Sequence, residues 1–128
     1  MDAVETVRAL ETRMEARDWE GVAALVHPAA VIEWPRTGET FTGAAYVAMN
    51  RAYPEGWSIT VRDVVGSGER AASDLEVTQE GVDGVYVAAG FWTVRDGQVV
   101  AGREYWSGPG LDDAPAWRAP YTSQANQP

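Results

Sequence analysis

The chain has 128 residues, of which 45% are hydrophobic and 23% are charged, a composition typical of one folded globular domain. It contains no cysteine and a single histidine, which excludes disulfides, thiolate nucleophiles, cysteine zinc sites and multi-histidine metal centres. Ten arginines stand against nineteen acidic residues, and the resulting net charge of −9 makes nucleic acid and anionic membranes unexpected partners. The acidic N-terminal segment does not resemble a signal peptide, and no apolar run approaches the ~18 residues of a membrane span. We therefore expect a cytoplasmic protein.

Helical periodicity dominates the first half of the chain. Asp2, followed three residues later by Glu5, is a pattern typical of a helix start, and apolar residues then recur at helical spacing. Asp18 and Thr42 are further candidate caps, and His27-Pro28 and Pro54 are candidate helix ends. These signals predict helices over residues 3–17, 19–26 and 43–53, a short strand over 31–34 and a polar loop over 36–40.

The second half is rich in Val, Ile, Thr, Tyr and Trp and is divided by glycine-containing turns, which predicts four strands. Short connections require neighbouring strands to be antiparallel. The expected fold is α+β, a cone-shaped curved antiparallel sheet with the N-terminal helices packed on its concave face and a cavity at the wide end. We expect one domain over residues 1–128, whose tail, 108–128, wraps the outside and is pinned by Trp117 and Tyr121. The strands are predicted over 57–65, 71–79, 84–95 and 98–107.

The order of these elements, together with the segments ARDWEGVAALVHPAAVIEWP, TGAAY and FWTVRDGQVVAGREYWS, resembles the nuclear transport factor 2-like superfamily and its SnoaL-like domains. That superfamily includes SnoaL-like polyketide cyclases, ketosteroid isomerases and limonene epoxide hydrolases. The resemblance covers residues 3–107 and implies the fold. It does not by itself imply one activity, because such a fold carries many functions.

Alignment with the isomerases and hydrolases implies that their full catalytic sets are absent. The isomerase general base falls on Trp34, its first-helix tyrosine on Leu10 and its oxyanion-stabilising acid on Gly90. One hydrolase aspartate aligns with Glu104, the other two catalytic residues fall near Asp74 and Glu76, and the water-binding pair falls on Trp34 and Ile32. The resemblance disfavours both mechanisms and leaves the polyketide cyclases, which use one carboxylic acid, least contradicted.

Three acids are the candidate catalytic residues: Glu104, Glu76 and Asp74. Side chains alternate between the faces of a strand, so Glu104 shares a face with Gly102 and Trp106. Two carboxyl groups in an aromatic cavity would shift each other's pKa and provide acid–base chemistry. The simplest pattern on 71–79, however, places the apolar residues beside Asp74 and Glu76 in the core and these acids in water, and both alternatives remain open.

Candidate ligand-binding residues come from the third helix and from the tryptophans. Tyr46, Asn50 and Tyr53 share one helical face and could orient a ligand carbonyl or hydroxyl, although Tyr53 is equally a rim residue. Trp34, Trp92 and Trp106 would line an apolar cavity suited to a hydrophobic ligand. His27 precedes a proline in a predicted turn, which favours a surface position.

These observations favour a SnoaL-like enzyme that performs general acid/base chemistry on a small hydrophobic metabolite, with no metal and no cofactor. Isomerisation, cyclisation, dehydration and hydrolysis are all open. One alternative is a non-catalytic protein that binds a small ligand, and another is a dimeric interaction domain with a vestigial pocket. We expect a homodimer formed through the convex face of the sheet.

Overall fold

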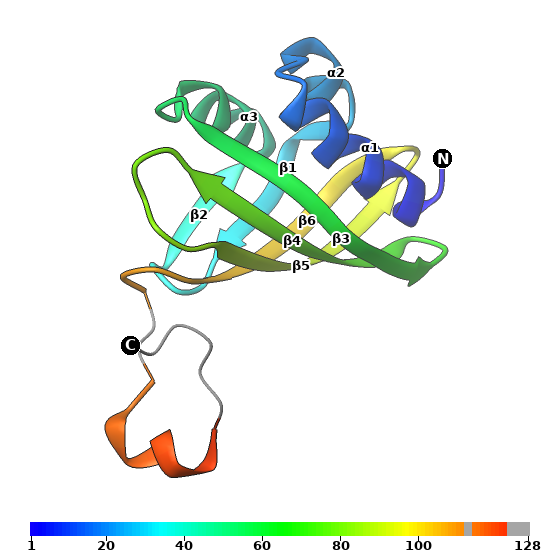
Figure 1. The fold of residues 1–128 in the computed structure, drawn as a ribbon. Coiled ribbons are helices and arrows are strands. Elements are labelled where there is room, and N and C mark those ends of the chain that lie inside the picture. The colour runs from blue at the N-terminus through cyan, green and yellow to red at the C-terminus, as the bar shows by residue number, and fades with distance from the viewer. Residues whose placement is uncertain (112–113, 123–128) are drawn as a thin grey trace.

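A computed structural model describes residues 1–111 and 114–122 of the chain. It has the predicted α+β architecture, with a strongly curved six-stranded sheet and helices on its concave side (Figure 1). The strands lie in the order β2-β1-β6-β5-β4-β3. All neighbours are antiparallel except β1 and β6, which are parallel. The elements are α1 (Ala3–Glu15), α2 (Trp19–Ala24), β1 (Val26–Trp34), β2 (Glu39–Thr42), α3 (Gly43–Ala52), β3 (Trp57–Ser67), β4 (Arg70–Gln79), β5 (Tyr86–Arg95), β6 (Gln98–Ser107) and a 3-10 helix (Ala116–Tyr121).

The three predicted caps begin the three α-helices. The Asp2 carboxylate accepts from the backbone N of Glu5 at 2.9 Å, and Asp18 and Thr42 make equivalent bonds at 3.0 and 3.1 Å. Each cap satisfies a backbone N–H that a helix start leaves without a partner. Helix α1 ends at Glu15, two residues earlier than predicted, and the chain then turns through Arg17 at a positive φ of 59°.

Two corrections concern the segment between α2 and α3. The strand predicted over 31–34 begins at Val26, where the chain leaves α2 and pairs with β6. Residues 39–42, expected to be in or beside a loop, form the edge strand β2, which pairs with β1 from Val31↔Thr42 to Trp34↔Glu39. A short edge strand is held by backbone hydrogen bonds to one neighbour, so its side chains need no alternating pattern.

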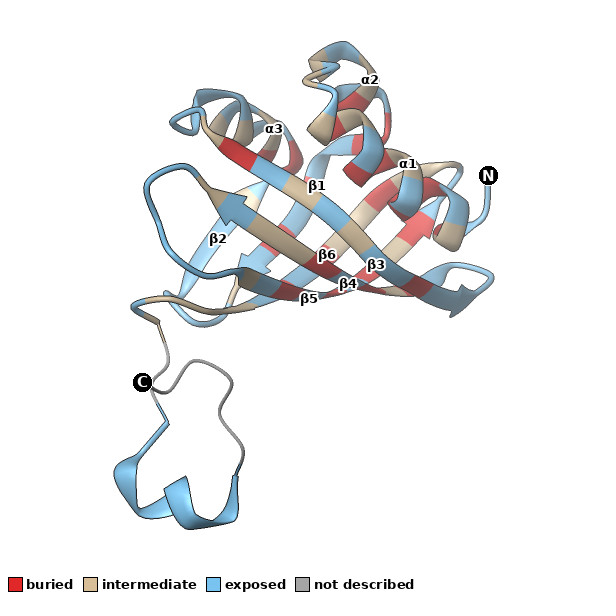
Figure 2. Ribbon diagram, viewed as in Figure 1, coloured by how far each residue is buried: buried red, intermediate tan, exposed pale blue. Residues whose placement is uncertain are grey.

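The core lies between α1, α3 and the concave face, where the buried residues gather in Figure 2. Trp92 on β5 is 1% exposed, and its Nε1 donates to Ser73 Oγ at 2.9 Å. Gly90 and Gly102 make room for its indole ring, because a Cβ on either glycine would stand 2.5 Å from ring atoms. Trp92 therefore fills the space beside these two glycines.

The predicted tail contacts are wrong for the residues that the structure describes. Trp117 and Tyr121 are 72% and 83% exposed, so they do not pin the tail against the body. The 3-10 helix that contains both residues projects away from the sheet in Figure 1. Residues 112–113 and 123–128, also part of the predicted tail, lie outside the described residues.

Candidate active site

A cavity of about 370 Å³ lies between the concave face, α1 and α3. This volume suits a small ligand, and the lining is mainly aromatic and aliphatic with a few polar groups. Glu11 and Met14 come from α1, and Tyr46 and Asn50 come from α3. The sheet and its loops supply Trp34, Trp57, Ile59, Leu75, Val77, Gln79, Tyr86, Glu104 and Trp106, while Arg36, Thr37, Glu39, Tyr53 and Leu111 complete the lining.

Glu104 lies in this cavity, as the alternation of β6 predicts, and is 2% exposed. Its Oε1 accepts from Tyr46 Oη at 2.6 Å and from Trp34 Nε1 at 3.0 Å. Burial raises the pKa of Glu104, whereas the two hydrogen bonds, which favour the charged form, lower it and so limit the rise. The carboxyl group is thus held in one orientation, and its catalytic role stays a prediction.

Helix α3 positions two of the three polar side chains that the sequence places on one face. Tyr46 is 2% exposed, and burial, followed by the charges of Glu104 and Glu11, raises its pKa well above the ordinary value. Tyr46 therefore keeps its proton and donates to Glu104. Asn50 lines the cavity and donates from Nδ2 to the Tyr46 carbonyl at 2.8 Å, while Tyr53 is 48% exposed near the cavity mouth.

Two of the three predicted wall tryptophans line the cavity. Trp34 and Trp106 pack edge to face with ring centroids 6.0 Å apart. Trp92 does not line it, because its ring lies in the core over the two glycines described above. Trp57, at the start of β3, is an additional wall residue.

Asp74 and Glu76 do not join Glu104, so the prediction that they share its cavity is wrong. Their side chains are 57% and 37% exposed on the opposite face of β4, where Arg62 lies 3.9 Å from the Asp74 carboxylate and 2.8 Å from that of Glu76. Leu75 and Val77 point into the cavity instead. An ionised carboxylate is stable in water beside an arginine, whereas a leucine gains by leaving water.

The second acid of the cavity is Glu11, which is not among the candidate residues predicted from the sequence. It is 2% exposed, and burial, assisted by the charge of Glu104, raises its pKa well above the ordinary value. Its Oε1 is buried and has no hydrogen-bond partner among the described residues. Spacing could have revealed it, because Glu11 stands at i+4 from Val7 and i−3 from Met14 and so belongs to the apolar stripe of α1.

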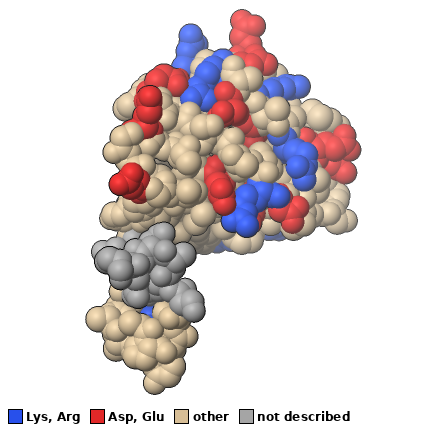
Figure 3. Space-filling model, in the orientation of Figure 1, with Lys and Arg blue, Asp and Glu red and all other residues tan. Residues whose placement is uncertain are grey.

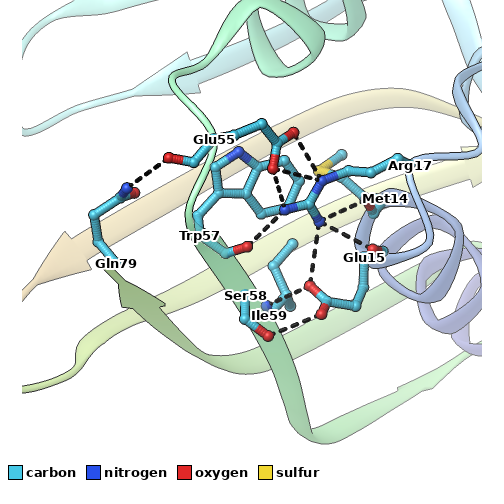
Figure 4. Close-up of polar contacts among 8 residues, drawn as sticks. All are labelled: Met14, Glu15, Arg17, Glu55, Trp57, Ser58, Ile59 and Gln79. Atoms are coloured by element: carbon cyan, nitrogen blue, oxygen red, sulfur yellow. Dashed lines mark hydrogen bonds and ion pairs between the residues drawn. The ribbon is translucent and has the colours of Figure 1, made fainter. Parts of the chain in front are cut away.

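One wall of the cavity is fixed by an arginine that follows α1 (Figure 4). The Arg17 guanidinium carbon lies 3.3 Å from the centroid of a Trp57 ring, and Nη2 donates to the Trp57 carbonyl at 2.6 Å. Arg17 also pairs with Glu55 at 2.9 Å and Glu15 at 3.4 Å. Stacking and pairing together hold the Trp57 ring in place.

Among the described residues, the remaining charged side chains indicate no further chemical centre. On the face seen in Figure 3, acidic and basic groups are interspersed. His27 is exposed, as predicted, and its Nδ1 accepts from the backbone N of Ala29 at 3.0 Å. Within 1–111 and 114–122, no cluster of three His, Cys, Asp or Glu residues could hold a metal ion. No helix of the described part is long and apolar enough to cross a membrane.

The fold matches that of known proteins. The SnoaL-like domain model matches residues 7–102, and the chain therefore belongs to this family of the nuclear transport factor 2-like superfamily. No curated protein matches the sequence. A solved structure from Kribbella flavida DSM 17836, provisionally named a ketosteroid isomerase, is 28% identical with a TM-score of 0.82 over 97% of this chain and 90% of that one.

Two other solved structures share the fold at lower identity. One is an LEH-like epoxide hydrolase of M. tuberculosis, with 16% identity and a TM-score of 0.71 over 82% of each chain. The other is IdmH of Streptomyces antibioticus, provisionally named a polyketide cyclase, with 21% identity and a TM-score of 0.68 over 80% of this chain and 90% of that one. The names given to these neighbours thus refer to different chemistries on one architecture.

Proposed function

We propose that the protein is an enzyme that performs general acid/base chemistry on a small, neutral, hydrophobic metabolite with its own side chains alone. The observation that carries this proposal is the carboxyl group of Glu104, buried in an apolar cavity with both of its hydrogen-bond donors on one oxygen. Within the described part of the chain no donor reaches Oε2 of Glu104. That oxygen is left to take a proton from a bound molecule.

The two donors make Glu104 a usable base. Hydrogen bonds from Tyr46 and Trp34 stabilise the ionised carboxylate, which burial alone would disfavour. They also fix the plane of the carboxyl group, so that Oε2 presents one direction to the ligand. Proton abstraction by a carboxylate is a step common to isomerisation, cyclisation and dehydration, and Trp106 and Leu75 supply apolar walls that exclude water from it.

Deuterium exchange on a simple ketone tests the proposal. The probe is 1-tetralone, a neutral ketone whose C–H bonds beside the carbonyl are weakly acidic. Proton NMR in D₂O follows loss of the signal of these hydrogens with wild-type protein, with Glu104→Gln and with Glu69→Gln, which alters an exposed glutamate outside the cavity. We expect Glu104→Gln to lower catalysed exchange by about 10²-fold or more and Glu69→Gln to match the wild type. If Glu104→Gln catalyses exchange at the wild-type rate, the proposal is overturned.

A second candidate, a ligand-binding protein without catalysis, is favoured by one observation. Glu104 Oε1 already accepts hydrogen bonds from Tyr46 and Trp34, and a carboxyl group held in this way can be purely structural. The position of the isomerase base is Trp34, which cannot take a proton. This alternative expects 1-tetralone to raise the melting temperature of the protein while exchange stays at the rate measured without protein.

We also propose that the convex face joins two copies of the chain. Val31, Val65, Val87, Phe91 and Tyr105 are 36 to 56% exposed on this face, an unusual share of large apolar residues. A shallow depression beside Phe91 is lined by charges of both signs, which suits a self-complementary two-fold contact. We expect light scattering to give the mass of a dimer for the wild type and that of a monomer for Phe91→Asp. If the wild type has the mass of a monomer, the proposal is contradicted.

A further inference from the structure

The cavity contains buried polar atoms that the proposed role of Glu104 does not use. Glu11 Oε1, Trp57 Nε1 and Trp106 Nε1 all lack a hydrogen-bond partner within the described residues, and all three side chains line the same cavity. Buried polar atoms in folded proteins are nearly always paired. These three atoms are themselves enclosed by the cavity wall, whereas Oε2 of Glu11 is not among the enclosed atoms and has no hydrogen-bond partner within the described residues, so this oxygen can contact a bound molecule.

Glu11 is the one of the three that can exchange a proton. It projects from α1 in the apolar stripe that also contains Val7 and Met14. Among the described residues no cation pairs with it, and the two donors that stabilise Glu104, Tyr46 and Trp34, are both engaged there. An ionised carboxylate with neither a cation nor a donor is strongly disfavoured in an apolar interior, so Glu11 is a neutral carboxylic acid with an O–H to donate.

The two acids of the cavity are therefore in different environments. Glu104 accepts two hydrogen bonds and is suited to the ionised form, while Glu11 accepts none and is suited to the neutral form. Titratable pairs whose surroundings separate them in this way commonly divide the acid and base roles. Their mutual charge interaction reinforces the division, because ionised Glu104 opposes ionisation of Glu11.

We propose that Glu11 is the proton donor of the cavity, a catalytic acid that binds an uncharged oxygen of the ligand while Glu104 acts as the base. This inference rests on the proposed function and deepens it by naming the ligand class. The ligand is a neutral, mainly apolar molecule with a carbonyl oxygen. Carboxylates are disfavoured, because ionised Glu104 and the apolar wall oppose a second negative group beside it.

The step is balanced in protons and electrons. Glu104 takes a proton from the carbon beside the carbonyl, and the electron pair of the broken C–H bond forms a C=C bond. The electron pair of the carbonyl π bond moves to oxygen, which takes the proton of Glu11. The products are an enol, a neutral Glu104 and an ionised Glu11. Return of a proton from Glu104 to carbon and from the enol O–H to Glu11 restores both groups.

Calorimetry that measures the affinity of the protein for three probes of similar shape tests whether Glu11 donates a hydrogen bond to the ligand. The probes are 1-tetralone, its hydrocarbon counterpart tetralin and the anion 1-naphthoate. We expect the wild type to bind the ketone about tenfold more tightly than tetralin and to bind 1-naphthoate least. Glu11→Met should abolish the preference for the ketone while tetralin binding is kept. Glu11→Gln, which retains an N–H donor, should keep part of the preference.

The matched control is Glu5→Gln, on the exposed face of the same helix, which should keep the full preference. If Glu11→Met retains the ketone preference, or if the wild type has none or binds neither probe, the inference is overturned. The deuterium exchange assay separates the two proposals. Loss of exchange in Glu104→Gln with an unchanged ketone preference in Glu11→Met overturns only the role of Glu11. A preference abolished by Glu11→Met without protein-dependent exchange overturns only the enzyme.

Infrared spectroscopy provides a measurement that does not depend on any probe. A neutral carboxylic acid has a C=O stretching band distinct from those of a carboxylate. We expect this band at neutral pH in the wild type and Glu5→Gln and its loss in Glu11→Met. Its absence from the wild type means that Glu11 is ionised and overturns the inference. With the ketone bound, the band should shift to lower frequency.

Discussion

On β6 the carboxyl group of Glu104 is buried and held by Tyr46 and Trp34, whereas on β4 the side chain of Glu76 is half-buried on the other face and pairs with Arg62. Both residues are glutamates in strands of one sheet. The difference is the face of the sheet, which changes with every residue along a strand. A shift of one position in the pattern thus separates a candidate catalytic acid from a surface ion pair.

The largest expected difference between the two faces concerns two adjacent residues of β4. Leu75 is 2% exposed on the concave face, and Leu75→Ala should lower the free energy of unfolding by about 2–5 kcal/mol because it removes buried methyl groups. Asp74→Ala on the convex face should change it by less than about 1 kcal/mol, as expected for an exposed ion pair. Urea denaturation measures both. A larger loss for Asp74→Ala would reverse the assignment of the faces.

The next largest expected effect is on the free energy of unfolding when Glu11 is replaced. Glu11→Met should raise the free energy of unfolding at neutral pH by about 1–3 kcal/mol, since it removes a buried polar group with no hydrogen bond. The pKa of Glu11 is raised in the folded protein, so the folded state keeps a proton that the unfolded chain releases above its ordinary pKa of about 4.3. Wild-type stability therefore falls as pH rises from that value toward the raised pKa.

The advantage of Glu11→Met should accordingly be smallest near pH 4 and grow as pH increases. Thermal denaturation across this range measures it, with Glu5→Met as the control on the exposed side of the same helix. A variant less stable than the wild type at neutral pH would show that Glu11 contributes to folding and not mainly to the cavity. The group would then be stabilised by contacts that its burial alone does not reveal.

Much of this organisation could be predicted from the sequence, because caps and alternating patterns are local signals. Asp2, Asp18 and Thr42 begin helices where the spacing predicts, and the meander follows from its turns. The edge strand β2 could not be predicted in this way, since its bonds depend on a partner strand rather than on its own pattern. The contact between Trp92 and two glycines likewise depends on the neighbouring strand β6.

The site was predictable in part for the same reason. The alternation of β6, together with the resemblance, predicts that Glu104 faces the cavity. Helical spacing predicts that Tyr46 and Asn50 share one face of α3. For Asp74 and Glu76 the sequence leaves two alternatives open, and the structure agrees with the simpler one, the alternation that places Leu75 inside and these acids outside. Glu11 is not among the candidate residues, because charged residues usually lie in solvent, although its spacing places it in the apolar stripe of α1.

The smallest expected effect tests the hydrogen bond that distinguishes Glu104 from the solvent-exposed acids. Tyr46→Phe removes the 2.6 Å bond and should lower catalysed deuterium exchange about tenfold. Because this bond lowers the pKa of Glu104, its loss should raise that pKa, and the pH at which the base becomes ionised should move upward. Tyr105→Phe, on the convex face, should leave both the rate and the pH profile unchanged. A lower rate with an unmoved profile would assign Tyr46 to ligand packing, because only a change at the base shifts its ionisation.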